Sequence, residues 1–96
     1  MINNVDIIFY IEFDRQDENA SSNSVCYKFP FVPRIGEDVY FDHSTYEKFA
    51  NDYTVSYLEK TNTKLRHYSR VISVYYEIDS QTIFVVLGLN PNVINR

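Results

Sequence analysis

Five stretches of this chain alternate apolar and polar residues with a period of two, which is the period of a β-strand. The alternation predicts strands near residues 5–14, 24–31, 38–42, 68–78 and 83–89. Between the third and fourth stretches the spacing of apolar residues changes to that of an amphipathic helix. The pattern therefore predicts a mainly β fold of the β-rich α+β class, with one helical insertion.

The helical insertion has a recognisable start. Ser44-Thr45-Tyr46-Glu47 has the residue types of a capping box, so a helix is predicted near residues 45–60 with Ser44 as its N-cap. The β-branched Thr54 and Val55 weaken the middle of this helix and leave its end open. One apolar stripe follows the helical spacing, formed by Tyr46, Phe49, Ala50, Tyr53 and Tyr57.

Short strands in sequence order can bury a common face by curling into a small five-stranded open antiparallel barrel or a strongly bent sheet. The helix would then cap one end of the barrel, and an open antiparallel sheet with the helix across one face is the alternative. Residues 1–96 are expected to form a single domain. The side chains predicted to face inward are Phe9, Ile11, Val39, Phe41, Ile72, Val74 and Val85.

Composition restricts the function more than it defines it. The formal net charge is −4, which argues against binding to nucleic acid, because phosphate backbones are bound by clustered Lys and Arg. Cys26 is the only cysteine, so the chain cannot form an internal disulfide. We expect a cytoplasmic protein without membrane contact, because neither a secretory signal nor a long apolar run is visible.

Part of the sequence resembles a known group of proteins. The turn Pro33-Arg34-Ile35-Gly36-Glu37, followed by residues 68–76 and 83–87, is similar to a pattern in small barrel proteins of phages and Bacteroidetes-type bacteria. The resemblance implies a Src-homology-like barrel and no established activity, and it transfers no catalytic residue to this chain. In the turn itself, Gly36 is expected to supply a positive φ.

The histidine, serine and cysteine residues do not have the spacing of a known catalytic or metal-binding site. His43 and Ser44 are neighbours in sequence, but adjacent residues at a helix start point in different directions. Cys26 has no nearby cation or helix N-terminus that would lower its pKa. His43 and His67 lack the spacing of known metal sites, and no glycine-rich phosphate loop is present. We therefore expect no enzyme, no cofactor and no metal.

Exposed aromatic residues indicate a binding surface instead. Tyr10, Tyr40, Tyr75 and Phe84 are predicted to lie on the outward faces of different strands, with Ile8, Val71 and Val86 beside them. Such a set of aromatic residues is typical of protein interfaces, although tyrosines on neighbouring strands can also stack without binding anything.

Three arginines could form a polar rim. Arg34 and Arg70, with Arg66, could hold a carboxylate or a phosphate. Ion pairs with Glu37, Asp38 or Asp42 are the alternative.

These observations favour a non-enzymatic protein-interaction module that binds another protein or itself. By analogy, the resemblance implies an accessory or inhibitor protein of a phage or mobile element, with action against a host defence system as one such role. The alternative function is sequestration of a nucleotide, with its base stacked on tyrosine and its phosphate held by Arg34 or Arg70.

Overall fold

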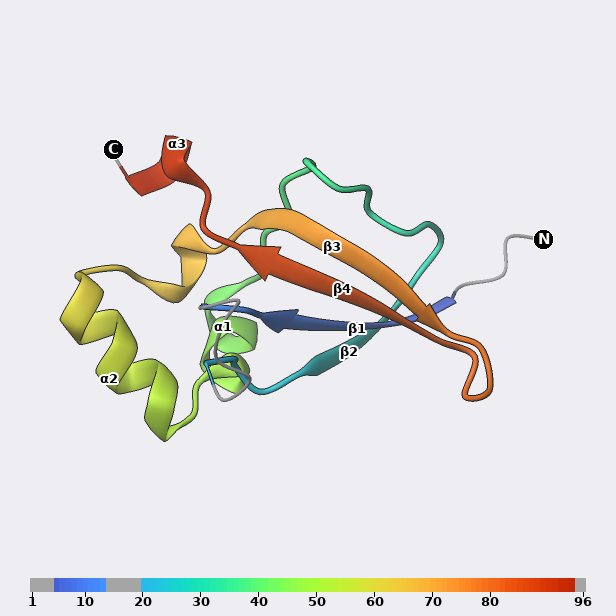
Figure 1. Cartoon of the computed structure of the whole chain (residues 1–96), viewed down its shortest axis with the longest axis horizontal. Helices are drawn as coiled ribbons and strands as arrows, with labels where there is room; N and C mark the ends of the chain where they lie inside the picture. The colour runs from blue at the N-terminus through green and yellow to red at the C-terminus, as the bar shows by residue number, and fades with distance from the viewer. Residues whose placement is uncertain (1–4, 14–19, 95–96) are drawn as a thin grey trace.

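The computed structural model describes residues 5–13 and 20–94. Its elements, in chain order, are β1 (Val5–Ile11), β2 (Val25–Phe29), α1 (His43–Phe49), α2 (Asp52–Thr61), the 3-10 helix η1 (Leu65–His67), β3 (Arg70–Glu77), β4 (Thr82–Gly88) and α3 (Pro91–Ile94). The four strands form one sheet in the order β2-β1-β4-β3 (Figure 1). The mainly β class is confirmed.

The sheet is mixed and open in the part of the chain that the structure describes. β1 pairs with β4 in parallel, whereas β1 with β2 and β3 with β4 are antiparallel. β2 and β3 lie at opposite edges of the sheet. The prediction of a five-stranded antiparallel barrel is therefore not confirmed. Alternation along a sequence shows which residues can form strands, but it does not show which strand pairs with which.

The third predicted strand, residues 38–42, is not a strand. It makes one bridge, between Asp38 and Arg70, and the amide of Val39 donates to the carbonyl of Ser69 at 2.7 Å. The chain then leaves the edge of β3, and the ring of Phe41 packs on that of Phe9 with centroids 5.3 Å apart. Packing of an aromatic side chain thus takes the place of strand pairing in this segment.

The turn before this segment behaves as expected. Gly36 has a φ of 93°, and its amide donates to the carbonyl of Val71 at 2.8 Å. The positive φ is a conformation that glycine adopts without steric cost. Gly36 therefore lets residues 36–39 reach the start of β3.

A β-bulge changes the faces of β3. The pairing with β4 shifts between Val71 and Ser73, so Val71 faces the core and is 1% exposed. The prediction that Ile72 faces inward is therefore wrong, as is the prediction that Val71 faces outward. An extra residue in one strand reverses the alternation on one side of the bulge. Ile72 instead lies against Gly88, where an added Cβ would come within 2.8 Å of its Cγ2 atom.

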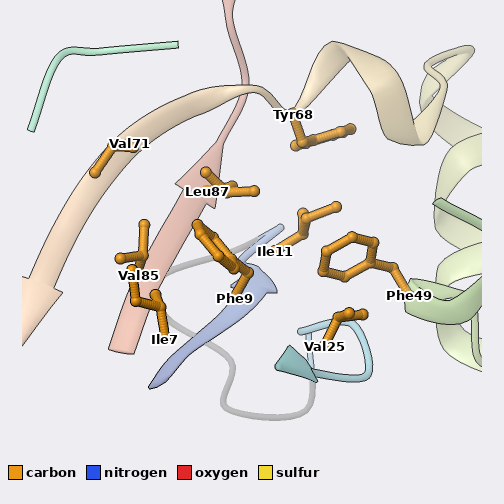
Figure 2. Close-up of a cluster of buried hydrophobic side chains, with 9 residues drawn as sticks. All are labelled: Ile7, Phe9, Ile11, Val25, Phe49, Tyr68, Val71, Val85 and Leu87. Carbon is orange, nitrogen blue, oxygen red and sulfur yellow. The ribbon is translucent and has the colours of Figure 1, made fainter. Parts of the chain in front are cut away.

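The hydrophobic core lies on one face of the sheet, which we call the core face. Phe49 from α1 packs there against side chains of β1, β2 and β4 (Figure 2). Of the other predicted core residues, Phe9, Ile11 and Val85 are buried, and Val39, Phe41 and Val74 are half-buried against the cluster. The buried cluster consists of Ile7, Phe9, Ile11, Val25, Phe49, Tyr68, Val71, Val85 and Leu87.

The predicted single helix is two helices. Ala50 and Asn51 have extended backbones between α1 and α2. Asn23 donates through its amide to the carbonyl of Phe49 and through its side chain to that of Ala50, both at 2.9 Å. These bonds satisfy carbonyls that the end of a helix leaves free, so a loop distant in sequence stabilises the break.

The helix caps also differ from the prediction. Ser44 is not an N-cap, because α1 begins at His43 after Asp42. A capping box instead starts α2, where the side chain of Asn51 accepts from the amide of Thr54 at 2.9 Å and the hydroxyl of Thr54 accepts from the amide of Asn51 at 2.8 Å. No helix among residues 5–13 and 20–94 is long and apolar enough to cross a membrane.

Candidate functional site

The side of the sheet opposite the core carries a row of apolar and aromatic side chains. Strand register places Tyr10 opposite Val86 and Ile8 opposite Phe84 across the central pair. Tyr75 is opposite Phe84 across β3 and β4. We call this surface the outward face, and its members are Ile8, Tyr10, Ile72, Tyr75, Phe84 and Val86.

Three of the four aromatic residues predicted to bind lie together on the outward face. The rings of Tyr75 and Phe84 stack with centroids 4.8 Å apart and planes 9° apart. The hydroxyls of Tyr10 and Tyr75 form a hydrogen bond of 3.2 Å. Burial, followed by this hydrogen bond, raises the pKa of Tyr10 above its ordinary value. Tyr10, Tyr75 and Phe84, which were predicted to face outward, thus form one continuous aromatic surface.

The helices pack on the other side of the sheet. Phe49 from α1 is part of the buried cluster, and Tyr57 and Leu58 from α2 pack against it. Among the described residues, the aromatic contacts of the outward face come from strands alone. Val86 at its centre is 1% exposed, whereas Tyr75 is 42% exposed. Tyr75 is therefore the aromatic side chain of this face that projects most into solvent.

Tyr40 does not belong to the outward face. It lies on the irregular segment that was expected to be the third strand, is 59% exposed, and lines a hollow on the core face. Its predicted position assumed that residues 38–42 form a strand, and in the structure they do not. The predicted aromatic set is therefore divided between the two sides of the sheet.

The arginines are not gathered into a rim. The Nε atom of Arg70 donates to Asp38 at 2.7 Å, and its Nη2 atom donates to Asn90 at 3.3 Å. Arg34 is exposed in the turn before Gly36, and Arg66 lines a separate hollow of about 730 Å³ beside α1 and α2. For Arg70, the alternative of an internal ion pair is confirmed.

Asn90 organises a polar cluster that sequence reasoning missed. Its side chain is 1% exposed and donates to Asp38 at 3.0 Å and to the hydroxyl of Ser69 at 3.1 Å. Its backbone amide donates to the carbonyl of His67 at 2.8 Å. The cluster therefore ties the residues after β4 to the start of β3 and to the segment that contains Asp38.

A hollow of about 460 Å³ opens on the core face beside β2, and we call it the aromatic cavity. Sequence analysis assigned Phe29 and Phe31 to an ordinary strand and missed their place here. Their rings meet edge to face with centroids 4.7 Å apart. The signal was the tyrosine and phenylalanine content, which exceeds what a small core can bury. The lining consists of Phe9, Tyr27, Phe29, Phe31, Pro33, Glu37, Asp38, Val39, Tyr40, Phe41 and Asp42.

Groups with chemical reactivity are dispersed. Cys26 is exposed, and the Nε2 atom of His43 lies 3.1 Å from the carboxylate of Glu47 on the surface of α1. The Nδ1 atom of His67 accepts a hydrogen bond from the amide of Lys64 at 3.0 Å. Burial, followed by the charges of Arg66 and Lys64, lowers the pKa of His67. His67 therefore acts as a neutral acceptor that stabilises η1.

Metal ligands are not grouped in the described chain. Residues 5–13 and 20–94 contain no group of three or more His, Cys, Asp or Glu side chains that could hold a metal ion. The resemblance to small phage barrel proteins stays a prediction. No family model, curated protein or solved structure matches the chain.

Proposed function

We propose that this protein is a non-enzymatic protein-interaction module, that its contact surface is the outward face of the sheet, and that a second copy of the chain occupies that face. The observation that carries the proposal is the cluster of Tyr10, Tyr75 and Phe84 on a sheet face whose aromatic contacts, in the described chain, come only from strands. Tyrosine provides a large contact area and loses little side-chain entropy on binding.

The geometry of the cluster favours binding over a purely internal role. Tyr75 and Phe84 are stacked on one another and lie on the paired strands β3 and β4. Their side chains should therefore lose little conformational entropy on association. Tyr75 remains 42% exposed although its ring is stacked on one side. A partner that covers its free side would remove an aromatic surface from water.

Charge supports a second copy as the occupant. All six side chains that define the outward face are uncharged. The carboxylates of Glu12, whose charge contributes to the raised pKa of Tyr10, and of Glu77, two residues after Tyr75, border them on the same side. Two copies can therefore meet over the six side chains if these carboxylates stay in water at the rim of the contact. At the β2 edge of the same side, Asp6 and Lys28 lie 4.0 Å apart and compensate one another. A chain with a net charge of −4 can therefore approach its own copy at this surface while its other charges stay in water.

The nucleotide-binding alternative is less well supported. It requires tyrosine and arginine side chains at one place, but Arg70 is bound by Asp38 and Asn90. Tyr10 and Tyr75 are hydrogen-bonded to one another, and among the hydrogen bonds of the described chain none joins them to Arg34 or Arg70. The role of accessory or inhibitor protein of a phage stays a prediction from the resemblance.

Sedimentation equilibrium over a range of protein concentrations tests the proposal. Tyr75→Ser should weaken self-association by about thirtyfold, which corresponds to about 2 kcal/mol for a hot-spot residue. Tyr40→Ser is the matched control, because Tyr40 is similarly exposed but lies on the other side of the sheet. A protein that stays monomeric at the highest concentration, or equal effects of the two variants, would refute the proposal.

A further inference from the structure

The aromatic cavity has the size and the walls of a small-molecule site. Its volume of about 460 Å³ lies within the range of about 300–1,000 Å³ that is usual for ligand pockets. It lies on the core face, so it is separate from the surface to which we assign protein binding.

The walls of the cavity are aromatic rings that remain open to solvent. Tyr27 is 37% exposed, Phe31 is 61% exposed and Tyr40 is 59% exposed. The rings of Tyr27 and Phe41 stack with centroids 5.9 Å apart and planes 27° apart, and the buried Phe9 also lines the cavity. One hydrogen bond fixes the ring of Tyr27, whose hydroxyl is 2.7 Å from that of Thr45 in α1.

The charges at the cavity all have one sign. Glu37, Asp38 and Asp42 line it, and the described lining contains no Lys, Arg or His. Arg70 compensates Asp38 from outside, at 2.7 Å. Glu37 accepts only an uncharged donor, the backbone amide of Arg34, and the carboxylate of Asp42 has no hydrogen bond to the helix that it precedes. In the described chain, the carboxylates of Glu37 and Asp42 therefore line the cavity without an ion pair.

We propose that the aromatic cavity binds an organic cation that carries an alkylated ammonium group. The face of an aromatic ring is negative and attracts such a cation within about 6 Å of the ring centre. Alkyl groups on the nitrogen also gain from contact with apolar walls, whereas an anion or a nucleotide phosphate would be repelled by Glu37 and Asp42. The aromatic walls carry the proposal, and the carboxylates select the sign of the ligand's charge.

Amide and aromatic NMR shifts measured during titration with choline test the proposal. We expect shifts concentrated in residues 27–31 and 37–42 and a dissociation constant on the order of millimolar. The neutral carbon analogue of choline, in which a quaternary carbon replaces the nitrogen, is the matched control ligand. It should bind about tenfold more weakly, since it keeps the shape but loses the charge.

Substitutions inside and outside the aromatic cavity test whether choline binds in it. Tyr40→Ala and Asp42→Asn should each weaken choline binding by about two- to fivefold. Tyr76→Ala and Asp52→Asn are the matched controls, because both residues are exposed and neither lines the cavity. The control variants should bind choline as the parent protein does.

The possible sources of the cation are distinguished by a second titration with a short peptide that carries trimethyl-lysine. Tighter binding of the peptide would assign the cation to a modified protein, and tighter binding of choline would assign it to a free metabolite. Equal affinity for choline and its neutral analogue would overturn the proposal and leave an apolar pocket. Shifts outside the cavity, or no shifts with either cation, would also overturn it.

Discussion

Replacing Phe41 by alanine tests how strongly the packing of the segment 38–42 on the core face stabilises the protein. Its ring has four aromatic neighbours, with centroids at 5.3 Å for Phe9, 5.9 Å for Tyr27, 5.6 Å for Tyr46 and 5.2 Å for Phe49. Phe41 lines both the aromatic cavity and the hollow beside α1 and α2. It therefore forms the wall between these two spaces.

The expected loss follows from burial and contacts. Replacing a buried phenylalanine by alanine costs about 3 to 5 kcal/mol. Phe41 is only half-buried, so we expect the lower end of that range, about 3 kcal/mol. For a domain of this size, such a loss corresponds to a melting temperature lower by roughly 10 to 25 °C.

Urea denaturation of the parent protein and the variant measures the difference. The m-value should stay unchanged, so that the shift in midpoint reports stability alone. Phe31→Ala is the control, because Phe31 is 61% exposed and, among the described residues, its ring pairs with one aromatic ring, that of Phe29. It should cost less than about 1 kcal/mol. A loss of this size for Phe41→Ala as well would show that the segment 38–42 is not packed on the sheet.

Three further predictions concern stability. Asn51→Ala should lower the free energy of unfolding by about 1 kcal/mol because it removes the cap of α2, whereas Ser44→Ala should leave the urea midpoint unchanged. Asn90→Ala should cost about 1 to 3 kcal/mol in the same assay because Asp38 would lose a donor, and a neutral result would mean that water replaces the amide. The raised pKa of Tyr10 in the folded state means that unfolding releases its proton above pH 10, so stability should fall as the pH rises above that value. Tyr10→Phe should reduce this alkaline loss, and an equal loss in both proteins would contradict the reasoning.

The sequence predicted local structure where one residue pattern determined it. The strands β1, β2 and β3 lie within the predicted ranges, β4 begins one residue before its predicted range, and the positive φ of Gly36 follows from its place in the turn. Tyr10 and Phe84 were assigned to the correct face because their strands pair without a bulge, and Tyr75 because it lies after the bulge of β3, where the predicted alternation holds. Periodicity is a local property, so these predictions needed no knowledge of distant contacts.

Other predictions failed where distant contacts decide the conformation. The break between α1 and α2 depends on hydrogen bonds from Asn23, and no pattern within residues 45–60 shows them. Ile72 faces outward because β3 has a bulge, which is a feature of its pairing with β4. Tyr40 lines the aromatic cavity because Phe41 packs on Phe9 instead of continuing a strand. Each error therefore has its cause in a contact between segments far apart in the sequence.

The parallel pairing of β1 with β4 also determines the order in which the protein can fold. Ile7 pairs with Ile83, so the middle of the sheet joins residues from opposite ends of the 96-residue sequence. Closing so long a loop costs entropy before the contact is made, whereas β3 and β4 are joined by a short turn. We expect the β3–β4 hairpin to form first and β1 to dock late, which pulsed hydrogen exchange would contradict if β1 were protected at the same time. During synthesis on the ribosome, β1 emerges before β4, with which it pairs in the folded protein. Until β4 has been synthesised, the apolar residues of β1 remain unpaired and can cause aggregation.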